Sequence, residues 1–198
     1  MNLLSGRASK TASVVLMPSA LEDPLQGPPG LLRLGVFLLC AAISTFFGAL
    51  VVAFFWRSQV PSYWQKIPMP PLLWVSTNLI LSSSVTFETG RRLWRLGRQE
   101  LASKFILATA CLGVGFLASQ VTAWRVLVGR GAYLSHSPWS SFFYIFTGLH
   151  ALHLLGGLIA LFILIWGRKR REWIDATCYY WHFMGILWIA LFYVLVNY

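Results

Sequence analysis

The chain is divided into five long apolar segments, separated by short stretches that hold nearly all of its Lys and Arg residues. Its composition is 57% hydrophobic and only 11% charged, which a soluble domain of this size does not sustain. A helix that crosses a bilayer needs about 20 mostly apolar residues. We therefore predict an all-α fold, a polytopic membrane bundle of five transmembrane helices. The predicted spans are about 34–55, 72–90, 105–124, 138–167 and 177–198.

These five spans form one membrane domain over residues 31–198. The preceding residues 1–30 contain several Pro and Gly residues and no sustained apolar run, so we expect a flexible N-terminal tail. The tail is not typical of a signal peptide, because the apolar stretch from Val14 to Met17 is too short.

The distribution of basic residues predicts the orientation in the membrane. Of the 16 Lys and Arg residues, 12 lie in the tail, in the second-to-third connection and in the fourth-to-fifth connection. Five crossings place these three regions on the same side, and basic residues accumulate on the inner side of a membrane. We therefore predict an inside N-terminus and an outside C-terminus. The net charge of +10 follows from this pattern, and we expect no nucleic-acid partner.

Polar and small residues inside the spans indicate which faces meet other helices. Asn78, Ser82 and Thr86 recur at intervals of four, so they share one face of the second segment, which we expect to contact protein. Gly113 and Gly115 would admit a close neighbour in the third segment. The fourth segment begins at Ser137 and Pro138, which are favourable residues for a helix cap and first turn.

The histidines are the first candidates for chemistry. Thr147, His150, His153 and Gly157 form a slanted stripe on the fourth segment, and His182 and Gly185 share a face of the fifth. Interhelical hydrogen bonding is favoured over metal ligation for these histidines. We interpret the three cysteines as small buried hydrophobic residues. The sequence therefore predicts neither a catalytic residue nor a metal or cofactor site in this chain. The cysteines are Cys40, Cys111 and Cys178.

Acidic residues are few. Glu88 lies one turn from a basic stretch, which favours an ion pair with Arg91 or Arg92, and a proton-relay role is the alternative. Glu172 and Asp175 lie beside four consecutive basic residues, so we expect local ion pairing there, with Asp175 retained as an ion-pair or proton-related candidate.

Two ordered motifs then resemble a known family. Thr147-Gly148-Leu149-His150 with His153, and Tyr179-Tyr180-Trp181-His182-Phe183 with Trp188, resemble the last two helices of subunit III of haem-copper terminal oxidases. Ser76 and Thr77, followed by the run to Ser84, are similar to that family's second-helix motif. Five spans correspond to the family's short bacterial form.

The resemblance implies a non-catalytic subunit in a bacterial cell (inner) membrane. Such a subunit binds subunit I and other oxidase subunits, contacts phospholipids and supports proton uptake during oxygen reduction and proton pumping. The haem and copper are expected in partner subunits. Family-motif residues would make the interhelical or lipid contacts, and they are Ser76, Thr77, Ser83, Thr147, Gly148, His150, His153, Tyr180, Trp181, His182 and Phe183.

The chain also departs from the family pattern. Ala41–Thr45 carries no carboxylate where many members have a buried Glu, Met184 and Gly185 replace a common Asp, and Ser76 replaces Asn. Three alternatives stay open at this point: an accessory subunit of a nitric oxide reductase, subunit III of a quinol oxidase, and a stand-alone membrane transporter or enzyme. The sequence does not identify the electron donor.

Overall fold

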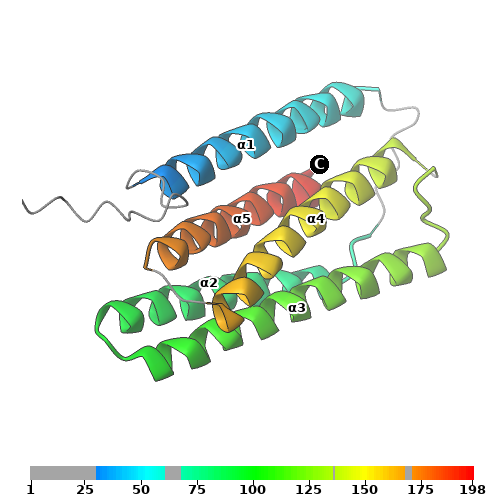
Figure 1. Cartoon of the computed structure of the whole chain (residues 1–198). Helices are drawn as coiled ribbons and strands as arrows, with labels where there is room; N and C mark the ends of the chain where they lie inside the picture. Colours follow the sequence, from blue (N-terminus) through cyan, green and yellow to red (C-terminus); the bar gives the residue numbers. More distant parts are fainter. Residues whose placement is uncertain (1–29, 61–67, 136, 168–170) are drawn as a thin grey trace, which may run out of the picture.

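The computed structural model describes residues 30–60, 68–135, 137–167 and 171–198, and they form five helices (Figure 1). The predicted tail falls on residues 1–30, of which only Gly30 lies within the described part. The helices are α1 (Leu31–Ser58), α2 (Leu72–Arg95), α3 (Gln99–Gly129), α4 (Pro138–Trp166) and α5 (Arg171–Asn197).

The start of α4 is fixed by a local side-chain cap, as its sequence predicts. In α4, the Ser137 hydroxyl accepts from the Ser140 amide, the Ser140 hydroxyl accepts from the Ser137 amide, and Pro138 occupies the first turn. α5 begins six residues before its predicted start, so Glu172 lies in its first turn, where negative charge is favourable.

Four of the described helices are long and apolar enough to cross a membrane, namely α1, α3, α4 and α5. α2 does not reach that apolarity, because hydroxyl side chains are spread along it. Many of these hydroxyls donate back to the carbonyl three or four residues earlier, as Thr77 does to Leu73 and Thr89 to Val85. This internal pairing lowers the cost of placing them in an apolar environment.

The polar face predicted on α2 is largely exposed on the surface of this chain. Asn78 and Ser82 are exposed on the surface of the chain, and Asn78 donates to the Trp74 carbonyl of its own helix. Thr86 alone of the three reaches a neighbour, the Thr109 hydroxyl of α3 at 2.9 Å. Contact of Asn78 and Ser82 with protein stays a prediction, because spacing shows which residues share a face but not which neighbour that face meets. The face that does turn inward carries Leu73, Ser76, Ile80, Ser83, Phe87 and Gly90.

α5 lies in the middle of the bundle (Figure 1). It packs against α1 and α4 on one side and α2 on the other, while α2 and α3 form a long antiparallel pair. α1 packs against α5 and α4 and buries few of its own residues, chiefly Ile43, Phe47 and Phe54.

Two glycines admit the large side chain of Trp181 into the centre of the bundle. A Cβ atom on Gly113 of α3 would lie 2.8 Å from the Trp181 ring, and one on Gly157 of α4 would lie 3.3 Å from it. Gly115 does not have this function, because the nearest atom to its added Cβ belongs to Leu79 at 3.7 Å, an ordinary contact. The fit of the Trp181 ring against α3 and α4 therefore depends on Gly113 and Gly157.

We expect Gly113→Ala to destabilise the protein by about 1–3 kcal/mol, because the added methyl group overpacks the bundle against an indole that is fully buried. Gly115→Ala on the same helix is the matched control. It should be neutral or stabilising, since Ala is favoured over Gly within a helix by about 1 kcal/mol. Thermal unfolding of both variants in detergent checks the difference, and equal melting temperatures would contradict it.

Candidate functional site

A buried carboxylate joins three helices at one end of the bundle. Asp175 of α5 accepts from Arg95 of α2 at 2.7 Å, Arg33 of α1 at 3.3 Å and Arg91 of α2 at 3.4 Å. Its side chain is only 2% exposed, whereas that of Arg95 is 36% exposed. Pairing and hydrogen bonding compensate the burial of such a charge.

These partners differ from the local ones expected from sequence. Asp175 lies within α5, with its side chain turned toward α1 and α2, and its ion pairs with Arg33, Arg91 and Arg95 all reach these other helices. Local pairing of Asp175 stays a prediction. Residues 168–170, part of the basic run invoked for that pairing, lie outside the described residues.

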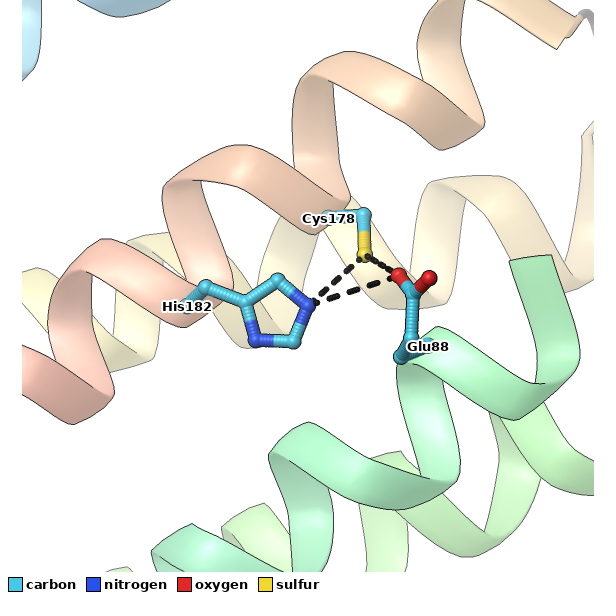
Figure 2. Close-up of side chains that lie close together, drawn as sticks. All are labelled: Glu88, Cys178 and His182. Carbon is cyan, nitrogen blue, oxygen red and sulfur yellow. Dashed lines mark hydrogen bonds and ion pairs between the residues drawn. The ribbon is translucent and has the colours of Figure 1, made fainter. Parts of the chain in front are cut away.

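Glu88 forms the second acidic centre of this end. Both its oxygens accept from Arg91 at 2.8 Å, and Oε1 also accepts from Arg92 Nε at 2.8 Å. The structure therefore contains both of the ion pairs considered from sequence. On its other side, Oε2 lies 3.7 Å from His182 Nε2 and 3.8 Å from Cys178 Sγ (Figure 2).

The motif residues of α2 and α5 hydrogen-bond to each other across the interior. The Trp181 indole donates to the Ser83 hydroxyl at 2.9 Å, and the Trp188 indole donates to Thr77 at 3.0 Å. Ser76, which is fully buried, pairs with the Ser119 hydroxyl of α3 at 2.7 Å. An indole N–H has no water to bind in an apolar interior, so a hydroxyl on a facing helix satisfies it.

The stripe on α4 faces α3, α5 and α1. Thr147 is buried and accepts from the Trp124 indole of α3 at 3.0 Å. His153 contacts the Leu149 carbonyl of its own helix through Nδ1 at 2.7 Å, while its backbone carbonyl accepts from Tyr180 at 2.8 Å. Gly148 borders open space, and Phe183 is partly buried against the core.

His150 does not make the interhelical hydrogen bond expected of it. Its ring is fully buried between Phe116 of α3 and Trp188 of α5, with centroids 5.7 and 5.2 Å away. Among the described residues neither ring nitrogen has a hydrogen-bond partner. Aromatic neighbours flank the imidazole on both sides, so the residue contributes through ring contacts.

Sequence reasoning missed several residues that complete these contacts. Ser119, Thr109 and Trp124 of α3 supply partners for α2 and α4, and each is a polar or amphipathic residue within a long apolar run. Cys178 is buried in the apolar core as expected, and its Sγ also lies 3.3 Å from Nε2 of His182, which is four residues later on the same helix face. That spacing was the available signal.

The long apolar helices and an interior of paired hydroxyl and indole groups define the class of a polytopic helical membrane protein. The sequence model of the family described as cytochrome c oxidase subunit III matches residues 28–198. The chain belongs to the cytochrome c oxidase subunit III family.

Curated relatives are similar over most of the chain. A protein of Nocardia farcinica named "Probable cytochrome c oxidase subunit 3" is 31% identical over 175 residues, covering 83% of this chain and 86% of its own length. A Synechocystis protein named "Cytochrome c oxidase subunit 3" is 30% identical over 179 residues, covering 84% of this chain and 75% of its own length.

We expect Asp175→Asn to destabilise the bundle by about 3 kcal/mol, because it removes the only charge that the three arginines share across helices in the described residues. Glu172→Gln is the control: this residue is exposed in the first turn of the same helix, so its loss should cost less than about 1 kcal/mol. Thermal unfolding in detergent measures both, and similar losses would contradict a special role for Asp175.

Proposed function

We propose that this chain is the non-catalytic subunit III of a respiratory haem-copper oxidase of the cytochrome c oxidase type, in a bacterial cell membrane. The observation that carries the proposal is the family match over residues 28–198, since it covers all five helices rather than one motif. In the proposed role the chain supports subunit I and proton uptake during oxygen reduction and proton pumping.

The internal contacts support a structural role for the motif residues. Thr77, Ser83 and Thr147 accept from indoles on neighbouring helices, and His150 lies between two aromatic rings. Side chains committed to such contacts hold helices together and are not presented to a substrate. On this basis we place the haem and copper in partner subunits.

We further propose that all five helices cross the membrane with the N-terminus inside. α2 has 24 residues and would span about 36 Å at a rise of 1.5 Å per residue, which exceeds a hydrocarbon core of about 30 Å. The ion pairs of Asp175 bring together the start of α1, the end of α2 and the start of α5. This meeting of helix ends supports alternating crossings, and it lies at the arginine-rich end expected inside.

The outer surface is suited to subunit I and to lipid. α1 exposes large apolar side chains, including Phe37, Leu38 and Val52. Near the other end of the bundle, an apolar pocket between the start of α2 and the end of α5 is lined by Leu73, Trp74 and Phe192, among others. Apolar surfaces of this kind accommodate lipid chains or the helices of a membrane partner.

Purification of the tagged chain from native membranes tests the assembly. We expect it to retain haem-bearing subunits, seen as haem absorbance and oxygen consumption in the eluate. Recovery of the folded chain without haem in every mild detergent would contradict the proposal. Oxygen consumption by the eluate separates it from a nitric oxide reductase, and the donor that supports turnover separates cytochrome c from quinol oxidases.

The His150→Ala variant distinguishes a subunit from a stand-alone transporter or enzyme. For a subunit, the variant loses ring contacts in the interior, so less haem-bearing partner should co-purify with it. Unchanged co-purification combined with loss of a separate activity would favour the stand-alone alternative. Haem content per tagged chain, compared with that of the wild type, measures the outcome.

A further inference from the structure

Three different donor groups converge between α2 and α5. The Cys178 Sγ lies 3.3 Å from His182 Nε2 and 3.8 Å from Glu88 Oε2, and the latter two atoms lie 3.7 Å apart. Figure 2 shows the three side chains pointing toward one another, two from α5 and one from α2. A thiol, an imidazole and a carboxylate therefore form a nearly equilateral triangle.

The triangle matches the donor spacing of a tetrahedral zinc site. With Zn–S near ~2.3 Å and Zn–N and Zn–O near ~2.1 Å, tetrahedral angles place sulfur about 3.6 Å from nitrogen or oxygen and nitrogen about 3.4 Å from oxygen. Each observed distance lies within about 0.3 Å of these values. We propose that Glu88, Cys178 and His182 bind a divalent metal ion of the zinc class, which joins α2 to α5.

The helix geometry explains why these donors meet. Cys178 and His182 are one turn apart on α5, so both project from the same face, and Glu88 lies opposite them on α2. Because the donors come from two helices, an ion held by all three would resist their separation. The free energy of metal binding would then add to the stability of the α2–α5 contact.

The surroundings supply the outer contacts that a ligating carboxylate needs. Arg91 and Arg92 donate to Glu88 and fix its orientation, and Oε2, which accepts from Arg91 Nε, has a second lone pair for an ion. Glu88 and the Cys178 thiolate together balance the charge of a divalent ion. The two arginines oppose a cation, but Asp175 pairs with Arg91 and offsets part of that repulsion.

One donor is buried and the other two are partly exposed, so an ion could enter from the exposed side. Cys178 is buried, while the side chains of His182 and Glu88 are 34% and 23% exposed.

A thiolate and an imidazole select a borderline or soft metal over Ca²⁺ or Mg²⁺, which prefer oxygen ligands. A fourth position remains for water. Such an ion is separate from the haem and copper of partner subunits, and it departs from the expectation that the cysteines serve only as apolar residues.

Zinc content of the purified assembly tests the site. Membranes carrying the tagged full-length chain are exposed to micromolar Zn²⁺, the protein is purified and desalted, and zinc per chain is measured by mass spectrometry. We expect one zinc equivalent more in the wild type than in Cys178→Ala. His182→Gln and Glu88→Gln should weaken retention at least tenfold. X-ray absorption at the zinc edge should show one sulfur neighbour at about 2.3 Å that Cys178→Ala removes.

Cys111→Ala is the matched control, because Cys111 is an exposed cysteine on α3, away from the three donors. It should retain the same zinc and the same sulfur signal as the wild type. Far-ultraviolet circular dichroism verifies that Cys178→Ala is as helical as the wild type, so a loss of zinc is not a loss of fold. Equal zinc in wild type and Cys178→Ala, or a wild-type zinc edge without sulfur, would overturn the proposal.

Discussion

The indole of Trp181 on α5 contacts residues of three other helices at one point in the bundle. It projects from α5, occupies the space left by Gly113 of α3 and Gly157 of α4, and donates to Ser83 of α2. Its bulk requires glycine on two neighbours, and its N–H requires a hydroxyl on a third, because no water is present in an apolar interior to replace that acceptor. The position of α5 between the other helices follows from these requirements together.

The elements of the fold could be predicted from the sequence, but several of their ends could not. Apolar runs identified all five helices, and Ser137 and Pro138 identified the start of α4 because a cap is a local signal. α5 begins before its apolar run, in a charged segment whose Asp175 pairs with α1 and α2. An apolar run shows which part of a helix can lie in lipid. The start of α5 is instead stabilised by charged residues far away in the sequence, and spacing along the sequence does not reveal them.

Fewer of the contacts in the interior could be predicted, because they depend on which face of each helix turns inward. The four-residue spacing of Asn78, Ser82 and Thr86 correctly placed them on one face, yet the inward face of α2 is the one that meets Trp181 and Trp188. His150 shows the same limit, since its identity suggested hydrogen bonding and its neighbours proved to be aromatic rings. Which partner faces a residue depends on the rotation of two helices about their axes, and that rotation is decided by shape complementarity across the whole interface.

α1 depends on the rest of the bundle in a different way. Its contacts are with α5 and α4, its buried residues are few, and its outer face is apolar along most of its length. Without a hydrophobic driving force between helices in lipid, aromatic contacts such as Phe54 with Phe142 and the ion pair of Arg33 with Asp175 must hold it in place. The same carboxylate also binds Arg91 and Arg95 of α2, so the docking of α1 and the attachment of α2 to α5 are coupled through Asp175.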